Sequence, residues 1–378
     1  MKKKLLYISN FEAPYRVPFF NLLGDYYDMT LALSQNPEDR KERNKAWFQN
    51  EKRTYRVVYL KTTKLFGVKV GFGIKKMLGN YDLVFMDMYS NPTNMYAIWC
   101  MNRMGKQFVM SVDGMLPRDH QNLLVHKMKS YFLNSPTVML SPGKSTDMCL
   151  EEYGVSKSKI VRYPFTSLLK NDILSTVPTR TEKFELRKKL GMPCEGEDRV
   201  ILTVGRFSYA RGYGKGYDIL FKVMRRLPKT FHLYIVGDEP TQEFIDMKRE
   251  GRLDNVHFVG FMNKKSLSEY YKAADLFCLQ TRKDIWGLVV NEAMSNGLPV
   301  ITSNTCVAGL TLVEDGVNGY IACAEDDVTL EENISAILND EYLRKNMSEA
   351  SLRIIREWTI ENMANCHIES FEKILYTS

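Results

Sequence analysis

Two carboxylates, Asp284 and Glu292, have seven residues between them in the string DIWGLVVNEAMSNGLPVITS. Gly287 permits a tight turn, so we expect Asp284 in a loop and Glu292 inside the helix that follows. The N–H groups of that turn, from Gly287 through Leu288 to Val289, form a natural site for an anion, especially a diphosphate. Carboxylates beside it can accept hydrogen bonds from sugar or ribose hydroxyls. Either acid alone would equally suit a helix-terminal or solvated position, whereas the whole string favours a binding site.

A second group of candidate residues is cationic. Arg206 follows a predicted strand and Lys215 precedes a predicted helix in VGRFSYARGYGKGYDIL. Two permanent positive charges on one anion give charge-assisted hydrogen bonds without a metal. The glycine-rich loop between them has neither the order G-x-G-x-x-G nor the P-loop order G-x-x-x-x-G-K-[ST]. By itself it would equally suit a basic surface loop.

The first half of the chain offers three further candidates. Asp113 ends a predicted strand, where an Asp-Gly turn is the alternative interpretation, and His120 follows in the same loop region, where an exposed loop histidine is the alternative. Arg16, in APYR, is a cation that could meet an acidic group of a ligand.

The elements that must position these residues alternate between apolar strand-like runs and helical patterns, which indicates parallel α/β architecture. In open parallel sheets, ligands bind beyond the carboxyl ends of the strands, where the glycine-bearing and polar loops of the second half lie. Strands are expected at 4–10, 29–33, 55–60, 83–88, 108–112, 138–140 and 160–163, and again at 200–204, 232–236, 257–258, 276–279, 300–302 and 320–322.

Polar and proline-bearing connections interrupt this alternation once. We therefore expect an N-terminal Rossmann-like domain at 1–165, an interdomain passage at 166–198, a C-terminal Rossmann-like domain at 199–357 and a last helix at 358–378 that packs back on the first domain.

Bulk composition fits a globular protein, since 44% of the residues are hydrophobic and 26% are charged. The seven cysteines have no C-x-x-C spacing, which favours a reducing, cytoplasmic location. The N-terminal apolar run is too short for a signal peptide, and there is no run of 18 apolar residues that could span a membrane.

One stretch is strongly basic. Between Lys52 and Tyr81 there are eight basic residues and no acidic ones, and the part from Lys61 to Lys76 also carries aliphatic and aromatic side chains. Such a segment can lie on the inner, anionic face of a cell membrane. Nucleic-acid binding and a solvated lysine-rich loop are the alternatives, although a net charge of +7 is small for a nucleic-acid binder of this length.

The second half resembles the donor domain of the family-4 retaining glycosyltransferases (glycosyltransferase group 1). The matching motifs follow the family's order over 199–323, and a weaker resemblance extends through APYRVPFFNLL, SVDGM and LEEYGVSKSKI. The motifs of the second half are GRF, KGYD, IVGDEP, VHFVGF, YYKAADLFCLQT, DIWGLVVNEAMSNGLPVI and LVEDGVNGY.

The resemblance implies a GT-B fold, in which two Rossmann-like domains with parallel sheets face a central cleft. It implies that the N-terminal domain binds the acceptor and that the C-terminal domain binds the nucleotide sugar. It implies that Arg206 and Lys215 hold the donor diphosphate, that Glu292 binds the ribose and that Asp284 contacts the transferred sugar. Asp113 becomes the first-domain candidate for catalysis, and Arg16 and His120 become candidates on the acceptor side, where Arg16 could meet an acidic acceptor group. Further donor contacts are expected from the turn at Gly287, Leu288 and Val289, from the strand-end glycines Gly205 and Gly237, and from Val259, Gly260 and Phe261 beside the base.

Two positions depart from the family pattern. The first carboxylate is Asp284 where relatives usually have glutamate, which bears on the identity of the donor sugar, and SNFEAPYR lacks the paired glycines of many relatives.

We expect a retaining, metal-independent transfer from a nucleotide-diphosphate sugar to a saccharide or lipid-linked saccharide in surface polysaccharide biosynthesis. A UDP-sugar is favoured as the donor, and a GDP-sugar is the alternative. No D-x-D pair or metal-ligand spacing occurs in the chain, and no cofactor is expected. The alternatives are a GT-B sugar-nucleotide epimerase and a non-catalytic protein that binds nucleotide sugars or polyanions.

Overall fold

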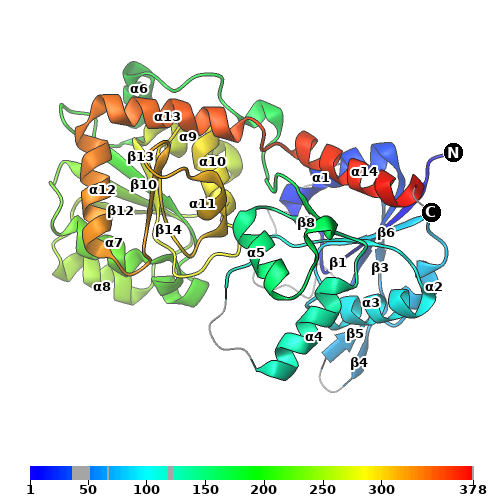
Figure 1. The fold of residues 1–378 in the computed structure, drawn as a ribbon. Helices are drawn as coiled ribbons and strands as arrows, with labels where there is room; N and C mark the ends of the chain where they lie inside the picture. The colour runs from blue at the N-terminus through cyan, green and yellow to red at the C-terminus, as the bar shows by residue number, and fades with distance from the viewer. Residues whose placement is uncertain (36–51, 66–67, 118–121, 377–378) are drawn as a thin grey trace. The chain divides into compact units, whose positions relative to one another are not determined.

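A computed structural model describes residues 1–35, 52–65, 68–117 and 122–376 (Figure 1). The chain divides into two compact units, each of which is described here by itself. The first unit comprises Met1–Ser167 together with Ile360–Ser378, and the second comprises Leu168–Thr359.

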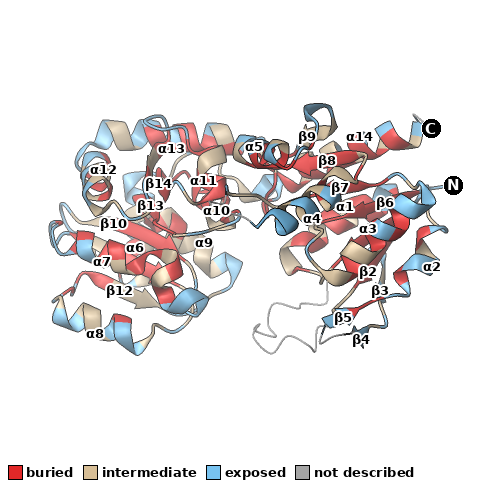
Figure 2. Cartoon of the chain, turned by 60° about the horizontal axis from the view of Figure 1, so that its bottom comes forward, coloured by how far each residue is buried: buried red, intermediate tan, exposed pale blue. Residues whose placement is uncertain are grey.

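The first unit is built on a seven-stranded parallel sheet of order β3-β2-β1-β6-β7-β8-β9. Its central strands are almost wholly buried (Figure 2), as expected of apolar runs that are covered by helices on both faces. A short antiparallel hairpin, β4 (Thr63–Leu65) with β5 (Val68–Val70), was not expected from the sequence. The parallel strands are β1 (Lys4–Ser9), β2 (Asp28–Leu33), β3 (Arg56–Tyr59), β6 (Leu83–Met86), β7 (Val109–Ser111), β8 (Val138–Ser141) and β9 (Ile160–Arg162).

The last helix, α14 (Ile360–Tyr376), packs on α1 (Val17–Tyr26) within this first unit. The ring of His367 lies 4.8 Å from that of Phe19, and the ring of Phe371 lies 5.3 Å from that of Phe85. The other helical segments of the unit are η1 (Pro14–Arg16), α2 (Ile74–Leu78), α3 (Pro92–Met104), α4 (Leu123–Asn134), α5 (Lys144–Glu152) and η4 (Lys157–Lys159).

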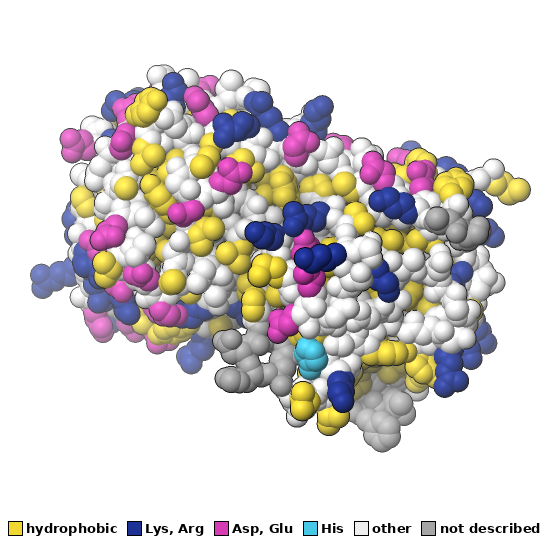
Figure 3. All heavy atoms as spheres, in the orientation of Figure 1, with side chains coloured by type: hydrophobic (Ala, Val, Ile, Leu, Met, Phe, Trp, Pro, Cys, Tyr) yellow, Lys and Arg dark blue, Asp and Glu magenta, His cyan; other side chains and the backbone are white. Residues whose placement is uncertain are grey.

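Helix α4 buries few of its side chains. Of its side chains only Leu133 is buried, while Leu123 and Leu124 are 76% and 77% exposed. Hydrophobic and basic side chains lie together over this helix (Figure 3). Among the described residues, no helix combines the length and apolar character that a membrane crossing requires.

The second unit contains a six-stranded parallel sheet of order β12-β11-β10-β13-β14-β15, so the expected α/β architecture is confirmed in both halves. Its strands are β10 (Arg199–Val204), β11 (Phe231–Val236), β12 (Val256–Val259), β13 (Leu276–Leu279), β14 (Val300–Ser303) and β15 (Gly319–Ala322). Its helical segments are η5 (Lys170–Asp172), α6 (Arg180–Leu190), η6 (Tyr209–Lys215), α7 (Tyr217–Met224), α8 (Gln242–Glu250), α9 (Lys264–Ala273), α10 (Leu288–Ser295), α11 (Val307–Leu312), α12 (Asp327–Asn339) and α13 (Glu341–Ile355).

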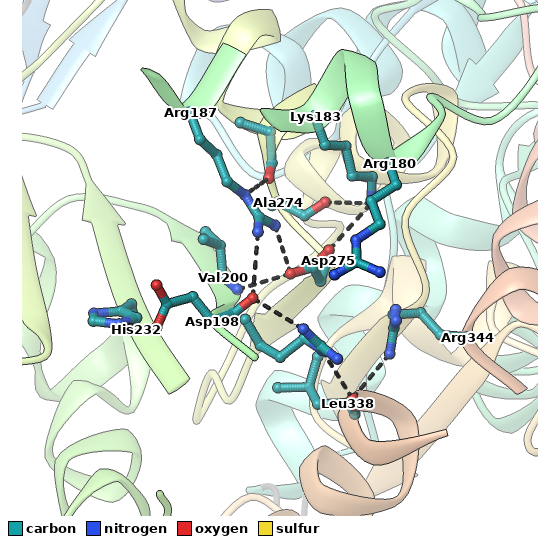
Figure 4. Close-up of polar contacts among 12 residues, drawn as sticks. Arg180, Lys183, Arg187, Asp198, Val200, His232, Ala274, Asp275, Leu338 and Arg344 are labelled. Carbon is teal, nitrogen blue, oxygen red and sulfur yellow. Dashed lines mark hydrogen bonds and ion pairs between the residues drawn. The ribbon is translucent and has the colours of Figure 1, made fainter. Parts of the chain in front are cut away.

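A buried ionic cluster fixes α6 to this second sheet (Figure 4). Arg187 Nη2 lies 2.5 Å from Asp275 Oδ2, and both side chains are less than 10% exposed. The same carboxylate accepts a hydrogen bond from Val200 N at 2.9 Å, and Lys183 donates to Ala274 O at 2.7 Å. Helix α6 therefore belongs to the second unit, although composition placed it in a passage between domains.

Candidate functional site

The loops after β10 and β11 touch backbone to backbone at the carboxyl edge of the second sheet. A Cβ atom added at Gly237 would lie 1.9 Å from the carbonyl oxygen of Gly205, so a side chain at Gly237 would force the loops apart. Asp238 accepts hydrogen bonds from the backbone N–H groups of Phe207 and Ser208. Sequence reasoning did not assign a role to Asp238, although it lies in the motif IVGDEP.

Lys215 and Asp284 meet at this edge. Lys215 Nζ lies 2.6 Å from Asp284 Oδ2, with side-chain exposures of 15% and 21%. Tyr209 flanks the pair, because the Lys215 ammonium is 5.6 Å from the centre of its ring. Arg206 lies in the loop after β10 and is exposed to solvent. The structure thus places Lys215 and Asp284 in direct contact, so the cation that would bind phosphate also orients the carboxylate.

The segment that leads to Lys215 has an unusual backbone. Ala210 and Arg211 both have positive φ, at 48° and 55°, a backbone region that residues other than glycine rarely occupy. Gly216 follows with φ 69°, and a Cβ atom there would lie 1.8 Å from Gln280 O. This close approach fixes Lys215 at the start of α7, and only glycine fits at position 216.

The turn that carries Asp284 is pinned to the loop before α11. Asp284 N donates to Thr305 O at 2.9 Å, and Val307 N donates to Asp284 O at 3.2 Å. Gly287 is left-handed, with φ 101°, and a Cβ atom there would lie 2.8 Å from Cys306 Sγ. The turn is therefore held by backbone contacts on both sides of Asp284.

Helix α10 begins directly after Gly287, which has no side chain to cap the first turn. The N–H groups of Leu288 and Val289 have no partner within the helix, because the first turn of any helix leaves its donors unpaired. The helix dipole adds positive potential at the same end. This terminus, adjoining Lys215 and Asp284, can accept an anionic ligand.

Glu292 lies in α10 itself and is half-buried. Tyr271 on α9 donates its hydroxyl to Glu292 Oε2 at 3.0 Å, a contact that the sequence motif did not reveal. Burial raises the pKa of Glu292, while the hydrogen bond from Tyr271 opposes that shift. The carboxylate keeps acceptor capacity for further hydroxyl groups.

The predicted base-bordering segment ends β12. Val259 is half-buried, Gly260 is exposed and the ring of Phe261 is 49% exposed. Gly237 N donates to Val259 O at 3.0 Å, which ties this strand end to the loop after β11.

In the first unit, Arg16 is buried beside two carboxylates that follow β6 and β7. Arg16 Nη1 lies 2.8 Å from Asp87 Oδ2, and Nη2 lies 2.6 Å from Asp113 Oδ1. Ser9 Oγ donates to Asp87 Oδ2 at 2.6 Å. Because its guanidinium is already paired twice, Arg16 is better placed to hold Asp113 in position. The sequence had instead suggested that Arg16 binds an acidic acceptor group.

Asp113 is the accessible member of this cluster, with its side chain 29% exposed. Asp87 is 6% exposed, and burial raises its pKa to about 6 despite the adjacent Arg16. Sequence reasoning missed Asp87, whose only signal is its position at the end of a buried strand. His120, the other first-half candidate, lies outside the described residues.

Comparisons with known proteins agree on one family. Residues 183–353 match the model of a family described as Glycosyl transferases group 1. An uncharacterized glycosyltransferase of Haemophilus influenzae is 31% identical over 188 residues, which cover 47% of this chain and 49% of that protein. The lipopolysaccharide glucosyltransferase WaaG of Escherichia coli is 28% identical over 169 residues, which cover 44% of this chain and 42% of that protein. The chain thus spans about half the length of the curated relatives it matches.

The fold comparison covers nearly the whole chain. The crystal structure of HepE from Anabaena in complex with UDP superposes with a TM-score of 0.79 at 16% identity, covering 98% of this chain and 100% of that one.

Proposed function

We propose that the chain is a glycosyltransferase that transfers a sugar from a nucleotide diphosphate to a saccharide or lipid-linked saccharide acceptor. Its GT-B fold and the match of residues 183–353 to the glycosyl transferases of group 1 support this proposal. The transfer would retain the anomeric configuration and need no metal. The observation that carries this proposal is the contact between Lys215 and Asp284 beside the open N-terminus of α10, with Glu292 on the same helix.

The chemistry of such a transfer requires positive charge at the leaving group. The transition state resembles an oxocarbenium ion, while negative charge builds on the departing phosphate. Lys215, Arg206 and the first-turn N–H groups of α10 would stabilise that charge. Preorganised donors of this kind lower a barrier by about 3–4 kcal/mol each in other enzymes. This set of groups is what supports a metal-free mechanism.

The two carboxylates would bind the sugar and the ribose of the donor. Asp284, held by Lys215, would accept hydrogen bonds from hydroxyls of the transferred sugar. Glu292, oriented by the Tyr271 hydroxyl, would accept hydrogen bonds from hydroxyls of the ribose. Asp284 is shorter than the glutamate usual in the family, so the donor sugar would sit closer to the turn at Gly287. UDP is the favoured nucleotide, a choice supported by the UDP complex of HepE.

On the acceptor side, Asp113 would contact the attacking hydroxyl, because it is the more accessible of the two carboxylates paired with Arg16 at the carboxyl end of the first sheet. Arg16 would fix its orientation. Surface polysaccharide synthesis is supported by the resemblance to WaaG, and a lipid-linked acceptor would bring the chain to the inner face of the cell membrane. The basic stretch from Lys61 to Lys76, whose described lysines are exposed, would contribute to that contact.

A thermal-shift panel with UDP-, GDP-, ADP- and CMP-sugars in the presence of EDTA tests the proposal. We expect one nucleotide sugar to raise the melting temperature by several degrees and to be hydrolysed slowly. Both effects should be lost in Glu292→Ala and Lys215→Ala, whereas Lys345→Ala, on the exposed face of α13, should keep them.

Three outcomes would contradict the proposal. No shift with any nucleotide sugar would mean that the donor site is wrongly assigned. Binding without turnover, even with a panel of p-nitrophenyl glycosides as acceptors, would indicate a binding protein. Conversion of the donor into its epimer, followed by NMR, would indicate an epimerase.

A further inference from the structure

In the part of the chain that the structure describes, an apolar face of helix α4 is left without cover. Leu124, Met128 and Tyr131 are spaced i, i+4 and i+7, so they lie along one side of the helix. They are 77%, 44% and 46% exposed. Single exposed apolar residues are ordinary, but an aligned row on a helix that buries only Leu133 indicates a surface that something else covers.

This row continues onto α3 and from there to the turn before α2. Asn102 Nδ2 donates to Tyr131 OH at 3.0 Å, which joins α3 to α4. On α3, the rings of Tyr96 and Trp99 lie 6.0 Å apart, and the ring of Phe72 lies 5.0 Å from that of Tyr96. We call the following residues the apolar band: Phe72, Tyr96, Trp99, Leu124, Met128 and Tyr131.

The elements that carry the apolar band, and the hairpin beside it, bear charges of one sign only. The elements β4, β5, α2, α3 and α4 contain no aspartate or glutamate. Arg103 lies over the ring of Trp99, with its guanidinium carbon 4.9 Å from the ring centre. The exposed cations of these elements are Lys64, Lys69, Lys75, Lys76, Arg103 and Lys127.

We propose that the apolar band is the surface by which the first unit docks on an anionic lipid bilayer, with α4 lying in the interfacial layer. Leucine, methionine, tryptophan and tyrosine side chains with flanking lysine and arginine are the composition of segments that bind at this depth. Basic side chains near the surface are attracted to anionic headgroups. The inference rests on the membrane contact in the proposed function and adds the element that enters the interface.

A second copy of the chain fits this surface poorly. A two-fold interface would bring the same patch from each copy together, and would therefore oppose two sets of cations that have no carboxylate among them. An anionic bilayer meets both features of the surface, since it accepts the apolar side chains and neutralises the lysines.

Vesicle flotation tests the docking of the apolar band on a bilayer, and it needs no nucleotide sugar. The full chain should float with vesicles of phosphatidylcholine mixed with phosphatidylglycerol, and far less with phosphatidylcholine alone or at high salt. The double variant Leu124→Ser with Met128→Ser should lower the partition coefficient about tenfold or more. Its matched control, Val328→Ser with Tyr342→Ser, replaces side chains that are 61% and 76% exposed in the second unit and should float like the wild type.

A fluorescence measurement gives a second readout. Emission from Trp99 should shift to shorter wavelength when the vesicles are added, and Trp99→Phe should remove that shift. Equal flotation of the double variant and the wild type, or no flotation with anionic vesicles, would overturn the inference. So would a concentration-dependent dimer that the double variant abolishes. A donor-induced thermal shift that survives in the double variant separates failure of this inference from failure of the glycosyltransferase proposal.

Discussion

Asp275→Asn should destabilise the second unit far more than its small change in shape suggests. The substitution keeps the size of the side chain, but it removes the buried negative charge that faces Arg187 at 2.5 Å and Lys183 at 3.5 Å. Two cations would then remain almost buried, with side-chain exposures of 5% and 12% and no carboxylate between them. Breaking one partner of a buried pair costs about 3–5 kcal/mol of unfolding free energy.

The expected shift in melting temperature follows from the size of the unit. Leu168–Thr359 is about 190 residues long, and in domains of that size 1 kcal/mol corresponds to roughly 2–4 °C. The transition of the second unit should therefore fall by roughly 6–20 °C in differential scanning calorimetry. The matched control is Glu269→Gln, which breaks the exposed pair between α6 and α9 that Lys189 forms at 2.5 Å. Exposed pairs contribute about 1 kcal/mol or less.

Acid titration provides an independent readout of the same pair. Burial by itself would raise the pKa of Asp275, but Lys183 and Arg187 outweigh it and the pKa is lowered. Its stabilising contribution is therefore complete above the pKa of the unfolded chain, about 3.9, and is lost as the pH falls through the lower folded-state value. Asp275→Asn should remove that part of the acid sensitivity. A cost equal to that of Glu269→Gln, with unchanged acid sensitivity, would refute the reasoning.

Three further predictions concern the candidate site. Gly216→Ala should destabilise the second unit by several kcal/mol, since its Cβ would meet a carbonyl oxygen at 1.8 Å, whereas Gly260→Ala, with nothing within 4 Å, should be nearly neutral in thermal unfolding. Tyr271→Phe should weaken UDP binding by about 1–2 kcal/mol in calorimetric titration, because Glu292 loses the hydroxyl that orients it; unchanged affinity would count against a ribose contact. Burial raises the pKa of Asp87 to about 6, so this group's contribution to the unfolding free energy should fall as pH rises from about 4 to 6, and urea midpoints of Asp87→Asn should lack that component.

The parallel sheets could be predicted because their strands are continuous apolar runs separated by glycine-bearing loops. The hairpin of β4 and β5 could not, since its strands of three residues each are lysine-rich and too short to show an alternating pattern. The spacing of Asp284, Gly287 and Glu292 is local, so the turn and the helix that follows it were predictable from one string of sequence.

Contacts between distant segments leave no such signal. Tyr271 reaches Glu292 from another helix, and Arg16 reaches Asp113 from 97 residues away. The sequence therefore suggested that Arg16 could meet an acidic acceptor group, while the fold pairs it with two carboxylates of the chain itself. In the same way, the polar composition of α6 suggested a passage between domains, because the buried role of Arg187 depends on Asp275, 88 residues further along.

The return of α14 to the first unit has a consequence for synthesis on the ribosome. The core of the first unit is incomplete until Phe371 has emerged from the exit tunnel, because that ring packs against Phe85 on the central strand β6. The second unit is one uninterrupted stretch, Leu168–Thr359, and it is released earlier. We therefore expect the nascent chain to finish folding its second unit first, which reverses the usual order from N-terminus to C-terminus.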